Sequence, residues 1–275
     1  MKPRNQFRLL ASLAAAIGAF AAVAPAAGAE TPAPGYSQFA GCPSPKTENP
    51  AVTACLRSDI TGGKIKIGNK TVPISKPMTL SGGTELEGAN FVYNSKGGLS
   101  PTKLEVPGGV IGLTGLDWLV NFLGIEQLKL YAEAQLAGVP QVLGAENIRL
   151  PIKVHLINPA LGNNCYIGSN SNPIVLNLIT GTTSPPAPAK PITGKSPEYS
   201  FDPTLIILHG NNGVFVDNTF SAPGASGCQL TLFGFIPVGL NSVVNSTSGL
   251  PAPAGTNETV QNYNLELVEA GLVYP

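Results

Sequence analysis

The chain has 275 residues with 16 basic and 16 acidic side chains, so its formal net charge is zero. So few basic residues argue against a nucleic-acid partner, because nucleic-acid binding needs a concentrated basic surface. Hydrophobic residues make up 43% of the chain and exclude an intrinsically disordered protein, while 32 glycines and 26 prolines indicate a fold with many turns.

Residues 1–29 have the pattern of a secretory signal peptide. Three basic residues precede an apolar run at 9–23, and Ala27-Gly28-Ala29 supplies the small residues that a signal peptidase recognises. The apolar run is shorter than the ~20 residues that a membrane-spanning helix needs. We therefore expect cleavage before Glu30 and a secreted protein of the extracellular space or cell wall, with no transmembrane anchor after cleavage.

The four cysteines are expected to form two disulfides, because export brings the chain into an oxidising environment. Of the three possible pairings we favour Cys42–Cys55 and Cys165–Cys228, since the first is confined to the N-terminal segment and the second flanks the larger body of the chain. The spacing contains neither a C-x-x-C motif nor a Cys/His cluster, so we expect no metal site.

Cys165 has a second interpretation, as a reactive thiol in the asparagine-rich stretch "LGNNCYIGSNSNP" (161–173). A catalytic thiol needs a base beside it, and the chain offers only His155 and His209. The disulfide is the preferred interpretation.

Beyond the signal peptide, the pattern predicts an extended, proline-rich segment at 30–56 that carries the small disulfide loop. A single β-rich domain is expected at 57–275. Its first element is a hairpin over 64–74, where apolar and polar residues alternate on both sides of a two-residue turn at Gly68-Asn69.

Period-two alternation predicts further strands at 128–136, 148–157 and 262–268. In 148–157 every second residue is aliphatic and is expected to face the core. Pro151 lies on the other face, which suggests an edge strand or a bulge.

Helical spacing is confined to two short stretches. Residues 116–123 form the first, and 238–248 the second, which begins after Pro237 and ends before Gly249. With about ten short strands between turn signals, the chain is expected to be mainly β, as an antiparallel β-sandwich or open barrel with one or two short helices.

Known catalytic patterns fit the chain poorly. "TGKS" (193–196) lacks the first glycine of a phosphate-binding loop, and "SPTK" (100–103) has a proline where a Ser-x-x-Lys pair needs a helix. "LHGNNG" (208–213) is interpreted as a hairpin turn with His209 at its shoulder. We assign no catalytic residue and expect no cofactor; the alternative is a secreted hydrolase that uses His209 and Asp217 with an unidentified nucleophile.

Three sequence features suggest binding. Asn163 and Asn164 could hydrogen-bond a cell-wall glycan, although asparagines in such stretches also close turns. Trp118 lies in an apolar stretch at 107–125, and residues 218–257, which include the apolar stretch 230–240, carry no charge. These two stretches are either buried core or a surface for lipid or membrane.

Long stretches of the chain resemble a family of exported actinobacterial proteins of unknown function. The resemblance rests on "ACLRSDITGGKIKIGNKTVPI", "PIKVHLINPALGNNCYIGSNSNPIVLNLITGTTSP" and "VDNTFSAPGASGCQL". It implies a secreted protein of a Gram-positive cell envelope and supplies no catalytic residue. The sequence therefore favours a non-catalytic, disulfide-linked β protein with a binding or structural role, with lipid or membrane-surface binding as the alternative.

Overall fold

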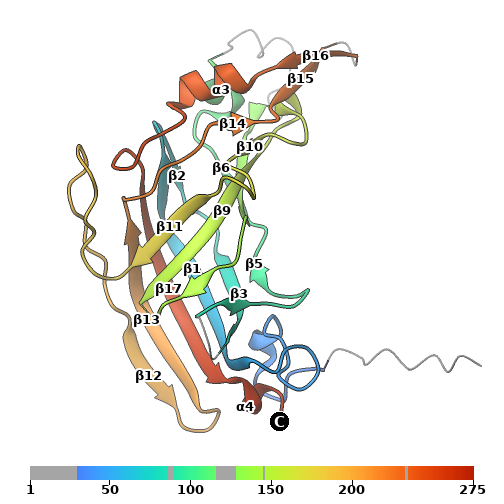
Figure 1. Cartoon of the computed structure of the whole chain (residues 1–275), viewed down its shortest axis with the longest axis vertical. Helices are drawn as coiled ribbons and strands as arrows, with labels where there is room; N and C mark the ends of the chain where they lie inside the picture. The colour runs from blue at the N-terminus through green and yellow to red at the C-terminus, as the bar shows by residue number, and fades with distance from the viewer. Residues whose placement is uncertain (1–29, 86–88, 116–127, 145, 233–234) are drawn as a thin grey trace, which may run out of the picture.

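The computed structural model describes residues 30–85, 89–115, 128–144, 146–232 and 235–275 (Figure 1). Fifteen strands form one antiparallel sheet: β1 (Val52–Ile67), β2 (Lys70–Pro73), β3 (Met78–Glu85), β4 (Phe91–Val92), β5 (Gly98–Leu99), β6 (Lys103–Glu105), β7 (Tyr131–Leu136), β8 (Gln141–Val142), β9 (Asn147–Ile157), β10 (Tyr166–Ile167), β11 (Ile174–Ile179), β12 (Glu198–Asp202), β13 (Ile207–Asp217), β14 (Ala225–Ser226) and β17 (Glu258–Glu269). The strands β15 (Gln229–Leu232) and β16 (Ile236–Gly239) pair separately.

The large sheet curls into a half-barrel. Its main path runs β14-β10-β9-β11-β13-β17-β1-β3-β4, and β7 extends it beyond β9 to β6. The curl brings β2 beside β6 and β5 beside β7, and no ladder joins these pairs among the described strands. The expected mainly β, antiparallel fold is confirmed, and the chain adopts the open-barrel form of it.

The longest strand, β1, is paired along most of its length with β17 on one side and β3 on the other. The predicted hairpin is present, because β1 turns through Gly68-Asn69 and Ile67 pairs with Lys70 of β2. Since β1 already begins at Val52, residues 52–56 of the expected N-terminal extension belong to the sheet.

The predicted turn at 208–213 is wrong. β13 continues through this stretch and contains a bulge between Gly210 and Gly213, where the backbone N–H of Asn212 donates to Asn264 Oδ1 at 2.9 Å. The hairpin turn lies earlier, between β12 and β13. There Asp202 Oδ1 accepts hydrogen bonds from the backbone N–H groups of Thr204 and Leu205, at 2.7 and 3.1 Å.

β9 is an interior strand, so the edge position suggested by Pro151 is also wrong. The carbonyl of Pro151 accepts from Ala137 N at 3.0 Å, and Ala137 lies between the end of β7 and the start of β8. In an antiparallel ladder the N–H and C=O groups of one residue point to the same neighbouring strand. The N–H that Pro151 lacks would therefore point to the gap between β7 and β8, where the ladder is interrupted. The expected inward residues are buried: Ile148, Leu150, Ile152, Val154 and Leu156.

Short helices lie at the two ends of the half-barrel (Figure 1). α1 (Gly109–Thr114) and α3 (Asn241–Ser248) pack together at one end, and α4 (Ala270–Val273) lies at the other near the C-terminus. α3 ends as expected at Gly249, whose φ of 67° suits glycine. It starts later than expected, because Pro237 belongs to β16. The expected helix at 116–123 lies outside the described residues.

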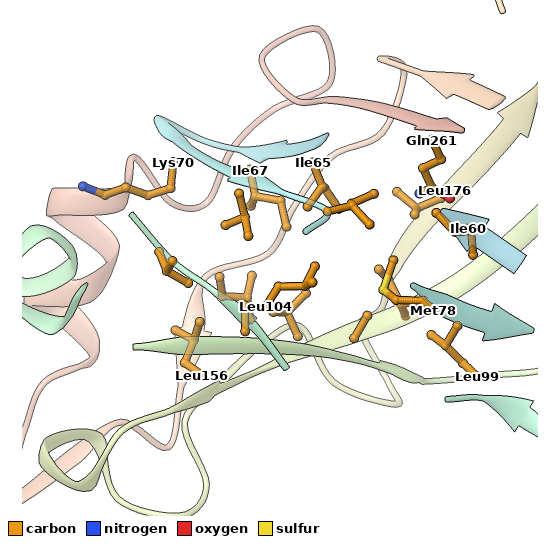
Figure 2. A pocket seen from close by; sticks show the side chains of 18 of the residues that line it. Ile60, Ile65, Ile67, Lys70, Met78, Leu99, Leu104, Leu156, Leu176 and Gln261 are labelled. Atoms are coloured by element: carbon orange, nitrogen blue, oxygen red, sulfur yellow. The ribbon is translucent and has the colours of Figure 1, made fainter. Parts of the chain in front are cut away.

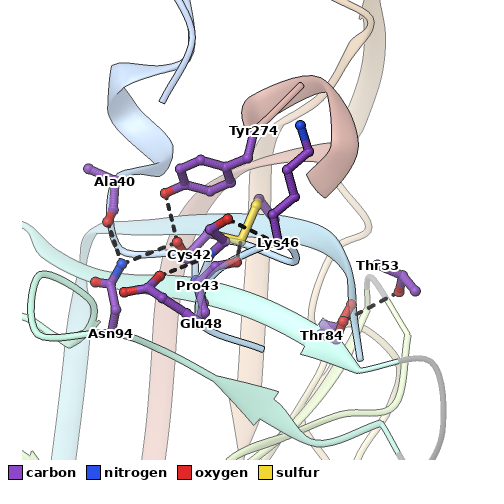
Figure 3. The surroundings of a disulfide bond; sticks show 11 residues. Ala40, Cys42, Pro43, Lys46, Glu48, Thr53, Thr84, Asn94 and Tyr274 are labelled. Atoms are coloured by element: carbon purple, nitrogen blue, oxygen red, sulfur yellow. Dashed lines mark hydrogen bonds between the residues drawn. A yellow bond between two sulfur atoms is a disulfide. The ribbon is translucent and has the colours of Figure 1, made fainter. Parts of the chain in front are cut away.

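Both disulfides have the favoured pairing, Cys42–Cys55 and Cys165–Cys228. The first lies in a small hydrophobic cluster between the N-terminal segment and α4 (Figure 3). There Tyr274 donates to the Cys42 carbonyl at 2.8 Å, and Asn94 Nδ2 donates to the carbonyls of Ala40 and Cys42 at 2.9 and 3.2 Å. The second disulfide lies at the α3 end, within the main core.

Candidate binding pocket

The inner face of the half-barrel encloses an apolar cavity of ≈ 80 Å³, within a void of ≈ 900 Å³ that includes space open to solvent (Figure 2). About 10–15 Å³ of such space holds one water molecule, so the cavity has room for several water-sized groups. Aliphatic side chains make up most of its wall: Ile60, Ile65, Ile67, Val72, Ile74, Met78, Leu99, Leu104, Val106, Leu113, Ala132, Ala134, Leu150, Ile152, Val154, Leu156, Ile167 and Leu176.

Two small residues of β7 leave space in this wall. Ala132 and Ala134 alternate inward on β7, opposite Leu156 and Val154 of β9. Both alanines are only partly buried, whereas their partners on β9 are buried. A strand with leucine or isoleucine at these inward positions would fill part of the cavity.

Three polar residues also line the pocket: Lys70, Ser248 and Gln261. Lys70 lies at the helix-capped end, where its aliphatic stem joins the wall and Nζ points away from the apolar side chains (Figure 2). Nζ donates to the carbonyl of Gly112 in α1 at 2.5 Å. An ammonium group has three donors, so this bond uses one of them.

Gln261 places a hydrogen-bond acceptor in the apolar wall. The residue is 5% exposed, and its Oε1 has no hydrogen-bond partner among the described residues. Its Nε2 donates to Thr259 Oγ1 at 3.1 Å, and that hydroxyl donates to the Lys64 carbonyl at 3.2 Å. Because the Thr259 proton is already used, Thr259 can only accept from Gln261, and this fixes which end of the amide is Nε2.

Ser248 is the last residue of α3 and is 1% exposed. Its backbone carbonyl accepts from Asn69 N at 3.0 Å, but its Oγ has no hydrogen-bond partner among the described residues. A helical serine commonly donates to the carbonyl four residues earlier. Here that option is unused, and Ser248 is one of the residues that line the cavity.

The sequence candidates Asn163 and Asn164 are exposed and lie outside this cavity. Asn163 borders a separate groove of ≈ 510 Å³ on the outer face, which also includes Lys103, Tyr131 and His155. The Nε2 atom of His155 lies 3.1 Å from the Asn163 carbonyl. Asparagine, histidine and tyrosine are thus brought together, whereas Asn164 does not line the groove.

His209 and Asp217 are not brought together. They lie eight residues apart on β13, roughly 25 Å at about 3.3 Å per residue. His209 Nδ1 is 3.4 Å from Glu266 Oε1. Asp217 is fully buried and accepts from the backbone N–H groups of Asn177 and Thr219, both at 2.7 Å. These contacts indicate a structural role for Asp217.

Trp118 lies outside the described residues. In the described part of that apolar stretch, 107–115, Val110 and Leu113 are buried in the core. The stretch 230–240 is divided, since Leu230 and Leu240 are buried while Phe235 and Ile236 are 74% and 42% exposed.

Across the described ranges, no three His, Cys, Asp or Glu side chains form a group that could hold a metal ion. None of the described helices is both long and apolar enough to cross a membrane. No protein-family model, curated protein or solved structure matches the chain. The site is therefore assigned from its geometry alone.

Sequence reasoning missed Lys70, Ser248 and Gln261. A signal for Gln261 was present, because period-two alternation in β17 places it on the same face as Tyr263 and Leu265, which are buried. A glutamine on an inward face is unusual enough to mark a site. Nothing local to α3 distinguishes Ser248 from an ordinary helix-terminal serine.

Proposed function

We propose that this protein is an exported binding protein that holds the aliphatic part of a ligand inside its curled sheet. The observation that carries the proposal is the cavity, whose wall is aliphatic except for Lys70, Ser248 and Gln261. Binding sites for small molecules combine an apolar lining with a few polar groups that orient the ligand.

The energetic cost of an empty cavity supports this proposal. Unfilled core volume costs roughly 24 cal/mol per Å³, so a cavity of ≈ 80 Å³ costs on the order of 2 kcal/mol when empty. A ligand that fills it recovers part of that cost through dispersion contacts and removal of apolar surface from water. Ligand binding is therefore expected to stabilise the folded protein.

The experiment is a titration with a homologous series of alkanes and primary alcohols, from propyl to decyl. Binding is measured by native mass spectrometry and by the shift in the thermal unfolding midpoint. We expect affinity to rise with chain length until the cavity is full and then to level off. A midpoint that stays constant across the whole series would contradict the proposal.

Ala134→Leu is the diagnostic variant, because it adds a branched side chain where the wall is open. It is expected to weaken binding of the best ligand by at least about tenfold, since roughly 1.4 kcal/mol of lost contact has that effect. The matched control is Ala51→Leu at an exposed turn position. The proposal fails if both variants bind as the unmodified protein does.

The location we propose is the extracellular space or cell wall. The signal-peptide pattern at 1–29 supports export, and two disulfides suit an oxidising compartment. The resemblance to exported actinobacterial proteins agrees with this location. Recovery of the chain from culture medium with an N-terminus at Glu30 would test it, and retention of residues 1–29 would count against it.

The outer groove favours a second candidate function, binding of a cell-wall glycan. Sugar rings stack on aromatic faces and bond to amides, and the groove offers Tyr131 and Asn163. We expect Tyr131→Ala to reduce retention on purified cell-wall polysaccharide. Tyr93→Ala, at an exposed tyrosine outside the groove, is expected to leave retention unchanged. Equal retention of both variants would remove this candidate.

A further inference from the structure

We propose that the ligand is an aliphatic alcohol whose hydroxyl group donates a hydrogen bond to Gln261 Oε1. This inference rests on the proposed function, because it names the chemistry of the ligand in the same cavity. It adds a specificity-determining residue, Gln261, to a pocket whose wall is mostly aliphatic.

Gln261 Oε1 is a hydrogen-bond acceptor that the described residues leave unsatisfied. The atom is buried and has no partner among the described residues, and Gln261 is one of the residues that line the cavity. A buried acceptor without a hydrogen bond costs about 1–3 kcal/mol. Such a group at a cavity wall is satisfied when a bound molecule brings a donor to it.

The orientation of the Gln261 amide decides the direction of a hydrogen bond to the ligand. Thr259 Oγ1 donates to the Lys64 carbonyl, so it accepts from Gln261 Nε2 and holds the amide in one orientation. At Gln261 the cavity wall therefore presents a hydrogen-bond acceptor and not a donor. A hydroxyl group can donate to it, whereas an alkane has no donor and an ionised carboxylate only accepts.

The surroundings of this acceptor are apolar. Ile60 and Leu176 lie beside Gln261, at the end of the pocket away from Lys70 (Figure 2). The charged amine is thus at one end of the cavity and the neutral acceptor at the other. A neutral alcohol suits the Gln261 end, because an ion there would lose its hydration without a counter-charge.

The test compares hexane and hexanol on the unmodified protein and on Gln261→Met, which keeps a flexible side chain of similar length. We expect Gln261→Met to weaken hexanol binding roughly tenfold, which is the effect of losing one buried hydrogen bond. The affinity for hexane should change by less than about twofold. Ser248→Ala tests the other residue of this wall that has an unpartnered polar atom. The matched control is Gln229→Met, the same substitution at an exposed position outside the pocket. Both variants are expected to leave the hexanol-to-hexane ratio unchanged.

The outcomes separate the two proposals. If neither compound binds the unmodified protein, the proposed function fails and this inference fails with it. If both compounds bind and Gln261→Met weakens their binding equally, the proposed binding pocket is supported and the alcohol assignment is overturned. Loss of the hexanol preference in Ser248→Ala but not in Gln261→Met would also overturn it, because the hydroxyl would then lie at the α3 end.

Discussion

Two buried tyrosines differ in what their hydroxyl groups contact. Tyr263 is fully buried and stacks on Phe215 with ring centroids 3.7 Å apart, but its hydroxyl has no partner among the described residues. Burial raises the pKa of Tyr263, so the group stays neutral. Tyr274 is buried as well, yet its hydroxyl donates to the Cys42 carbonyl.

Removal of the two hydroxyls is expected to change stability in opposite directions. Tyr263→Phe should raise the free energy of unfolding by about 1 kcal/mol, because it removes an unpaired polar atom from the core. Tyr274→Phe should lower it by about 1 kcal/mol, because the Cys42 carbonyl loses its donor. Urea unfolding of both variants measures the difference. A loss of stability in Tyr263→Phe would show that its hydroxyl is satisfied in solution.

Glu146 connects three segments through its carboxylate. Oε2 accepts from Thr180 Oγ1 at 2.8 Å and from Ser196 Oγ at 2.9 Å, and Oε1 accepts from the Tyr199 hydroxyl at 3.3 Å. These hydrogen bonds, with Thr180 the strongest influence, hold the pKa of Glu146 below its usual value.

A lowered pKa in the folded state predicts a pH dependence. The stabilisation by Glu146 is complete above the ordinary pKa that the group has in the unfolded chain, and it is lost as the pH falls through the lower folded value. Glu146→Gln should therefore unfold at lower urea concentration than the unmodified protein at pH 7, and the gap should close in acid. The control is Glu105→Gln at an exposed position. A gap that stays constant down to pH 3 would contradict this explanation.

At the scale of elements, the junction of β11 and β13 depends on a side chain. The ladder between these strands contains one residue pair, Ile179 with Val216. Next to it, Asp217 Oδ2 accepts from the backbone N–H of Asn177 in β11, and Oδ1 accepts from Thr219 N and Oγ1, all at 2.7 Å. A buried carboxylate thus continues the sheet where backbone pairing stops.

Asp217→Ala is expected to destabilise the protein by about 3 kcal/mol, because it leaves buried N–H groups without their charged acceptor. The measurement is the urea midpoint, with hydrogen exchange at Asn177 as a local readout. Asp202→Ala, which removes an acceptor from the partly exposed β12–β13 turn, should cost less, about 1 kcal/mol. Equal costs for the two variants would argue against a special role at the junction.

The same elements show how far the sequence predicts the fold. Period-two alternation predicted β9 and the inward face of β17, because one buried face imposes one pattern. The turn predicted from "LHGNNG" was wrong, because in β13 these residues form a bulge in which Asn212 N–H donates to Asn264, a residue 52 positions along the chain. The pocket could not be predicted either, since it exists only when Ala132 and Ala134 meet the inner face of β9 and the opposite wall.

At the scale of the whole molecule, the two disulfides stabilise opposite ends of the half-barrel. Cys42–Cys55 belongs to the cluster around α4, away from the pocket lining. Cys165–Cys228 connects the pocket wall to the helix that caps it. The Cys165 carbonyl accepts from Leu156 N, and Cys228 N donates to Asn241 Oδ1 at the start of α3, both at 2.8 Å.

The two bonds should therefore differ in their effect on binding more than in their effect on stability. Chain entropy predicts that replacing both cysteines by alanine lowers the free energy of unfolding by roughly 3 kcal/mol for Cys42–Cys55, which spans 13 residues. For Cys165–Cys228, which spans 63 residues, the expected loss is roughly 4 kcal/mol. Only the double variant Cys165→Ala/Cys228→Ala should also weaken binding of the aliphatic ligand, because α3 and Ser248 then lose their covalent link to the pocket wall. Urea unfolding and ligand titration are measured on both double variants.

Each outcome of this comparison bears on where the ligand lies. Weaker binding in the Cys165 and Cys228 variant, with normal binding in the Cys42 and Cys55 variant, indicates that the aliphatic part of the ligand reaches the α3 end of the half-barrel. Equal weakening in both, measured well below their unfolding midpoints, would mean that binding depends on global rigidity and not on the capped pocket. At the same ligand concentration, an equal gain in unfolding free energy for the Cys42 and Cys55 variant and for the unmodified protein would support the first outcome, because the gain depends on the ratio of ligand concentration to Kd.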